Sequence, residues 1–140
     1  QGKSPLLIEI KDQPNKSVVD KLVERLKDYQ GEFAVQSFNP FYMIKVKKLA
    51  PKFIRGILAT ENPEHSKGKS AITRWALKNM PFNFLIKPDF ISYHYKGLPL
   101  KKKKTKGKAV IAWTVTDKQT TDNISPYCDN IIFENFIPKK

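Results

Sequence analysis

Cysteine is almost absent from this sequence, since Cys128 is the only one among 140 residues. A single thiol excludes an internal disulfide and a zinc site built from several cysteines. No apolar run approaches the roughly 20 residues that a membrane-spanning helix requires, and residues 1–5 lack the charged and apolar regions of a signal peptide. We therefore expect no membrane segment in this chain and a location in the reducing cytoplasm.

The sequence also lacks the glycine-rich loops that bind phosphate in many α/β proteins. Neither G-x-G-x-x-G nor G-x-x-x-x-G-K-[ST] occurs. An open, doubly wound parallel sheet usually carries such a loop after one of its strands. The other parallel architecture is the closed eight-stranded barrel, in which polar residues collect at the carboxyl ends of the strands. The six strands that the sequence predicts fit the open sheet in number and are two too few for the barrel, so both architectures remain open at this point.

Acidic residues are few compared with basic ones. Lysine and arginine total 26 against 13 acids, a formal net charge of +13, which favours anionic partners such as phosphate esters, nucleic acid or acidic membrane surfaces. Much of the excess lies in one run, Lys101 to Lys104 with Lys106 and Lys108. No aromatic residue is interleaved with these lysines, as a surface that stacks single-stranded bases would require. We therefore interpret the run as a solvated loop and expect no nucleic-acid partner.

Apolar patterning predicts strands that alternate with helices in a single domain. The predicted strands are residues 6–11, 33–38, 54–59, 90–95, 109–115 and 130–134. Helices are expected from residue 18 to near 31, from 40 to before 51, at 71–77 and within 118–127. We expect the second helix to turn Met43, Ile44, Val46 and Leu49 inward, and the lysine run to connect two strands without a helix. This alternation predicts parallel strands joined by right-handed crossovers.

Two charged residues follow the apolar start of the first predicted strand. Glu9 and Lys11 are two residues apart, so their side chains point to the same face of a strand. A pair with this spacing is most simply a local ion pair. The carboxyl ends of parallel strands are, however, where α/β proteins place their chemistry, so the pair is also a candidate for a functional site.

Five segments in order resemble the bacterial type of the glycerophosphodiester phosphodiesterase family. They are LIEIK at 7–11, QSF at 36–38, LAP at 49–51, AWTV at 112–115 and CDNIIFE at 128–134. The family fold is a parallel (β/α)8 TIM barrel, so the resemblance implies that residues 1–140 supply strands three to eight, the C-terminal portion of the catalytic domain. The implied reaction is metal-assisted hydrolysis of a glycerophosphodiester to glycerol 3-phosphate and an alcohol.

The resemblance also implies roles for individual residues. Glu9 resembles the third-strand carboxylate that binds a divalent cation, Mg²⁺ or Ca²⁺, and oxygen ligands suit such hard cations. Lys11 resembles the cation that contacts the phosphate, where a point charge stabilises developing negative charge. Phe38 and Trp113 resemble the apolar walls that contact the glycerol carbons, although Trp113 is also suited to the core.

The family's catalytic histidines are missing from this chain, together with its two further metal-binding carboxylates, because they belong to the first two strands and the loop after them. His65 and His94 occupy other positions; His94, near a strand end, and Glu134 are candidates for the border of the site. The barrel would lack two strands, so we expect the chain to be inactive alone and to need a partner or a second copy. Alternatives are a related phospholipid or sphingolipid phosphodiesterase and a basic module that binds phosphate or nucleic acid.

Overall fold

The computed structural model describes residues 4–15 and 17–138. These residues fall into two compact units, which are considered separately. The first contains the residues up to 58 together with 82–89, and the second contains 59–81 together with the residues from 90 onwards. No helix in the described part of the chain has the length and apolarity needed to cross a bilayer.

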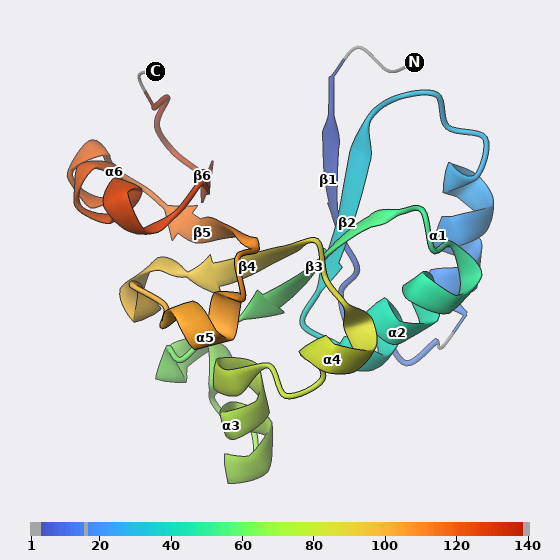
Figure 1. The fold of residues 1–140 in the computed structure, drawn as a ribbon, viewed down its shortest axis with the longest axis horizontal. Helices are drawn as coiled ribbons and strands as arrows, with labels where there is room; N and C mark the ends of the chain where they lie inside the picture. Colours follow the sequence, from blue (N-terminus) through green and yellow to red (C-terminus); the bar gives the residue numbers. More distant parts are fainter. Residues whose placement is uncertain (1–3, 16, 139–140) are drawn as a thin grey trace. The chain divides into compact units, whose positions relative to one another are not determined.

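The first unit is a parallel sheet with helices in its connections (Figure 1). Its elements are β1 (Leu6–Glu9), α1 (Val18–Leu26), β2 (Phe33–Ser37), α2 (Pro40–Leu49), β3 (Ile54–Ala59) and α4 (Asn83–Ile86). In this sheet β2 lies between β1 and β3: Val35 pairs with Ile8 on one side and with Arg55 on the other. Val35 is fully buried, as expected of a central strand that is covered on both faces.

The helices of the first unit form for local reasons that the sequence contains. α2 begins at Pro40, whose ring suits the first helical position, and the Asn39 side chain accepts a hydrogen bond from the Phe41 amide at 3.0 Å. α1 ends at Leu26 rather than near Gly31, because the Tyr29 amide donates to the Leu26 carbonyl in a tight turn.

One predicted core position of α2 is wrong. Met43 and Val46 are buried as predicted, whereas Leu49 is 45% exposed. Leu49 is the last helical residue, so the apolar period of the helix does not continue beyond it. The sequence pattern also did not predict α4, a single turn between Pro81 and Pro88.

The second unit repeats the parallel arrangement. Its elements are η1 (Pro63–Ser66), α3 (Ala71–Asn79), β4 (Phe90–His94), η2 (Tyr95–Gly97), α5 (Lys102–Thr105), β5 (Ala109–Val115), α6 (Lys118–Ile124), η3 (Ser125–Tyr127) and β6 (Asn130–Phe133). Here β5 is central, since Ala112 pairs with Tyr93 of β4 and with Ile131 of β6. Ala112, Val115 and Ile124 form a buried apolar cluster.

The lysine run differs from its prediction as a connection without a helix. Lys102–Thr105 form the helical turn α5, and Lys106 adopts a left-handed conformation that ends it. The run is otherwise as expected, because Lys101, Lys102 and Lys103 are exposed. This short turn contains no apolar side chain that could be buried against the sheet, so it covers little of the sheet.

Parallel strands alternate with helices in both units, which confirms the predicted α/β class. All six predicted strands are present among the described residues, and two of them, β3 and β5, have the predicted bounds.

Candidate active-site residues at the strand ends

Glu9 and Lys11 point in the same direction at the end of β1, as their spacing predicts. The Lys11 Nζ lies 3.3 Å from the Glu9 Oε1, and the two side chains are 74% and 34% exposed, respectively. Between them Ile10 points the other way and is buried. The structure thus contains the local ion pair, and both charged groups remain accessible to a solute.

Hydrogen bonds join the carboxyl ends of β1 and β2 and hold the predicted site residues of the first unit. The Ser37 hydroxyl donates to the Ile10 carbonyl at 2.6 Å, and the side-chain Nδ2 of Asn39 donates to Asp12 Oδ1 at 3.0 Å. Phe38 lies between Ser37 and Asn39 and is half-buried. Residues on both sides of Phe38 are therefore tied to the segment that carries Glu9 and Lys11.

In the second unit the structure brings together three rings that are far apart in the sequence. The ring centroid of His94 lies 4.8 Å from that of His65 and 5.0 Å from that of Trp113, and His65 lies 5.0 Å from Trp113. Trp113 and His94 are buried, whereas His65 is exposed. Trp113 is thus buried in the core, which is one of the two roles considered for it from the sequence. The exposed His65 packs against its ring at right angles.

His94 is held as a neutral imidazole. The Lys96 amide donates to its Nδ1 at 3.3 Å, which requires a lone pair on that nitrogen, and Asn62 Nδ2 lies 3.4 Å from its Nε2. Burial, followed by repulsion from His65 and Lys96, lowers the pKa of His94 to about 4. A group that exchanges protons in catalysis near neutral pH needs a pKa near that pH, so His94 is suited to packing and hydrogen bonding rather than to proton transfer.

Glu134 immediately follows β6. Its amide donates to the Val115 carbonyl at 3.0 Å, which continues the pairing of β6 with β5 by one residue. The residue is exposed. His94 and Glu134 therefore both occupy carboxyl ends of strands, the positions predicted for them, and their part in a site stays a prediction.

The described residues do not by themselves fit a divalent-cation site. No three His, Cys, Asp or Glu side chains gather at one place in the part of the chain that the structure describes. Glu9 offers one carboxylate, and calcium takes six to eight oxygen ligands. Further ligands would have to come from outside these residues, as the resemblance implies.

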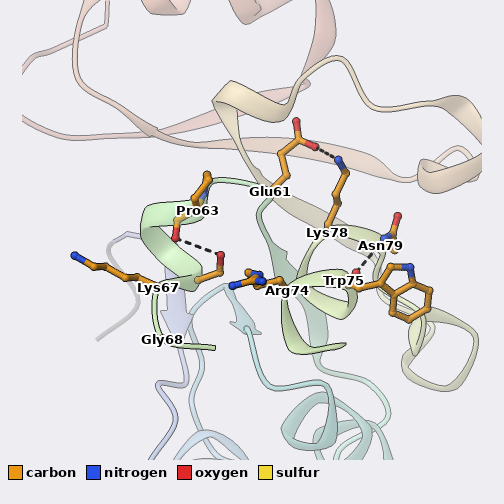
Figure 2. A pocket seen from close by; sticks show the side chains of 9 residues that line it. Glu61, Pro63, Lys67, Gly68, Arg74, Trp75, Lys78 and Asn79 are labelled. Carbon is orange, nitrogen blue, oxygen red and sulfur yellow. Dashed lines mark hydrogen bonds and ion pairs between the residues drawn. The ribbon is translucent and has the colours of Figure 1, made fainter. Parts of the chain in front are cut away.

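The sequence did not predict a pocket of about 600 Å³ that lies between η1 and α3 (Figure 2). Its lining includes Glu61, Lys67, Arg74, Trp75 and Lys78. At one end Lys78 Nζ forms an ion pair with Glu61 Oε2 at 2.7 Å. The basic and aromatic residues of α3 were visible in the sequence, but the loop that faces them has no periodicity from which its course could be predicted.

The comparisons with known proteins agree with this architecture. No protein-family model and no curated protein matches the sequence. Solved structures do match: a glycerophosphodiester phosphodiesterase from Parabacteroides distasonis aligns with 92% of this chain and 52% of its own, at 20% identity and a TM-score of 0.60. An Oleispira antarctica phosphodiesterase, solved with the product sn-glycerol-3-phosphate, aligns with 89% of this chain and 50% of its own, at 19% identity and a TM-score of 0.61.

A third match is the glycerophosphodiester phosphodiesterase from Thermotoga maritima, with 16% identity, a TM-score of 0.60, and coverage of 91% of this chain and 53% of its own. The chain thus spans about half the length of the solved structures that it matches. These likenesses show the fold: the chain has the architecture of part of a glycerophosphodiester phosphodiesterase, which confirms the predicted resemblance and the predicted incomplete (β/α)8 TIM barrel.

Proposed function

We propose that this chain is the C-terminal part of the catalytic domain of a glycerophosphodiester phosphodiesterase, which hydrolyses its substrate to glycerol 3-phosphate and an alcohol. The observation that carries the proposal is the fold match to such enzymes over about nine tenths of the chain and only half of theirs. At 16–20% identity the match shows only the fold. The proposed activity therefore also depends on the predicted roles of Glu9 and Lys11 at the end of β1.

The outer strands β1 and β6 support the presence of further strands in the active protein. Among the described residues, β1 is paired with β2 alone and β6 with β5 alone. Leu6, Leu7 and Phe133 on these outer strands are 41%, 42% and 45% exposed. An apolar strand with an unpaired edge favours association with another strand, as the two remaining strands of a barrel would provide.

In the proposed site Glu9 would supply one ligand to a divalent cation, Mg²⁺ or Ca²⁺, and the cation would polarise a phosphoryl oxygen when bound. Lys11 contacts the phosphate and stabilises negative charge as it develops. Phe38, half-buried next to Ser37, lines the apolar side that receives the glycerol carbons. The corresponding role of Trp113 stays a prediction, because its side chain is buried in the second unit. The catalytic acid and base belong to residues outside this chain, because neither histidine here matches the family positions and His94 is kept neutral.

The test is to express the complete reading frame that contains this chain and to follow glycerol 3-phosphate release from glycerophosphocholine with Mg²⁺, with Ca²⁺ and with a chelator. We expect turnover that the chelator abolishes, and a loss of kcat/KM of at least about a hundredfold in Glu9→Gln and Lys11→Met. Glu24→Gln, an exposed carboxylate on α1, is the matched control and should retain full activity. Equal activity in Glu9→Gln and the control would overturn the assignment.

Two further arms define the substrate and the role of the missing strands. An intact phospholipid and sphingomyelin are assayed beside the deacylated diester, and preferential hydrolysis of either would replace the proposed substrate by an acylated one. The 140-residue chain is assayed alone, and we expect no turnover. Metal-dependent turnover by this chain would show that it contains its own catalytic groups.

A further inference from the structure

Helix α3 exposes large apolar side chains to solvent. Ile72 is 80% exposed and Trp75 is 57% exposed, and residues three apart lie on the same side of a helix. None of the nine residues of α3 is buried. A surface helix of a folded protein normally turns such side chains towards the core, so this exposed pair requires another explanation.

Basic side chains lie beside this apolar pair. Lys67 and Arg74 line the same pocket as Trp75, and Figure 2 shows Arg74 between the η1 loop and the indole of Trp75. Arg74 donates to the Lys69 carbonyl at 3.3 Å, and no acidic side chain among the described residues forms an ion pair with it. Lys78 is the member of the group that has an acidic partner, Glu61.

The lysine run adjoins the other end of α3. The Lys104 ammonium donates to the Lys78 carbonyl at 3.1 Å, which places α5 next to the last turn of α3. Lys101, Lys102 and Lys103 are exposed beside it. The charge cluster that the sequence analysis assigned to a solvated loop is therefore continuous with the basic residues around Trp75.

We propose that α3, Lys67 and the residues Lys101–Lys104 form a surface that binds anionic phospholipid membranes; we call it the α3 surface. Trp75 and Ile72 enter the interfacial region, where tryptophan is favoured, while the basic side chains contact lipid phosphates. Each lysine or arginine held near an anionic leaflet strengthens binding about fivefold. The inference concerns the second unit alone and does not depend on the proposed phosphodiesterase activity.

A nucleic acid is the less suitable occupant. Binding of single strands uses several aromatic rings along a basic groove, whereas this surface pairs one indole with an aliphatic side chain. A lipid surface uses both, since the interface accepts apolar side chains of either kind together with surrounding basic residues.

The experiment is co-sedimentation of the 140-residue chain with vesicles of phosphatidylcholine alone and of phosphatidylcholine with about 30% phosphatidylglycerol. We expect binding to the anionic vesicles only, weakened strongly by about 0.5 M sodium chloride. Trp75→Ser and Ile72→Ser, at exposed positions, should each weaken binding by about tenfold. Phe84→Ser is the matched control, because Phe84 is a 69% exposed apolar residue on α4 in the other unit, and it should bind normally.

The charge contribution is tested with Lys102→Gln/Lys103→Gln, which should weaken vesicle binding more than tenfold. The control Lys21→Gln/Lys27→Gln removes two exposed lysines from the region of α1 and should have at most a small effect. Circular dichroism confirms that each variant is folded. The proposal is overturned if the two double variants bind alike, if Trp75→Ser binds normally, or if a short single-stranded RNA is bound more tightly than the vesicles.

Discussion

The Lys11 ammonium lies 3.3 Å from the Glu9 carboxylate, on the exposed end of an outer strand. An ion pair in this position contributes little to folding, because solvent screens it and two flexible side chains must be held in one geometry. The pair is therefore better explained by what it can bind than by stability.

We predict that Lys11→Ala lowers the free energy of unfolding of the chain by no more than about 1 kcal/mol. The same substitution should nevertheless strongly reduce turnover in the complete protein. Urea unfolding followed by circular dichroism measures the first effect. Lys118→Ala, which breaks another exposed ion pair, with Asp122, is the control, and a clearly larger loss of stability in Lys11→Ala than in this control would show that the pair is structural.

Arg55 has the opposite character. It is buried, and its guanidinium donates to four backbone carbonyls, those of Pro51, Phe53, Ile86 and Lys87, at 3.1–3.2 Å. Arg55→Ala would leave these carbonyls without a donor, and we predict a loss of about 3 kcal/mol in the free energy of unfolding.

The measurement is again urea unfolding. The control is Arg25→Ala, which removes the same type of side chain from an exposed position of α1. It should lower the free energy of unfolding by less than about 1 kcal/mol. Similar losses in the two variants would contradict the structural role of Arg55.

The stability of the chain should depend on His94 below neutral pH. Histidine has an ordinary pKa of 6.5, and in the folded chain burial lowers the pKa of His94 to about 4. Between these values the unfolded state binds more protons than the folded state, so stability falls as the pH decreases from 6.5 towards 4. We predict that His94 accounts for a loss of about 2 kcal/mol between pH 7 and pH 5.

His94→Gln removes this titration, so the variant should lose less stability than the wild type over the same pH range. Urea midpoints of both proteins at pH 7 and pH 5 provide the comparison, which cancels the contribution of the carboxylates. Parallel pH dependence in the two proteins would be inconsistent with a buried, neutral His94.

Cys128 should react slowly with disulfide reagents. Burial and the adjacent charge of Asp129 raise the pKa of its thiol, and the reactive species is the thiolate. We predict that the folded chain reacts about tenfold more slowly than the urea-unfolded chain at pH 8, measured by thionitrobenzoate release. Glutathione under both conditions is the control for the reagent, and equal rates for folded and unfolded protein would refute the prediction.

Local patterns determined most of the secondary structure. The apolar runs at residues 54–59 and 109–115 became strands with the predicted bounds, because a buried strand of a parallel sheet is apolar throughout. Asn39-Pro40 located the start of α2, since both residues act on their immediate neighbours. The end of α1 and the exposure of Leu49 were not predicted, because both concern the last turn of a helix, where the apolar period alone does not define the final residue or its burial.

For the candidate site, the sequence predicted only that its residues lie at the ends of strands. Glu9 and Lys11 follow from a period of two, which is a property of any strand. The packing of His65 against His94 and Trp113 joins residues up to 48 positions apart, and no local pattern contains such a contact. The same is true of Asp89 and Asp129, which precede β4 and β6 and accept hydrogen bonds from the amides of Arg55 and Val110.

The sequence by itself therefore determined the class of the fold, the order of its strands and the charged pair at the end of the first one, because these depend on composition and on short periodicities. Tertiary structure alone decided that His94 is neutral, that Arg55 is buried among carbonyls, and that the lysine run adjoins the last turn of α3. Each of these properties arises from burial or from proximity between distant segments, and both exist only once the chain has folded.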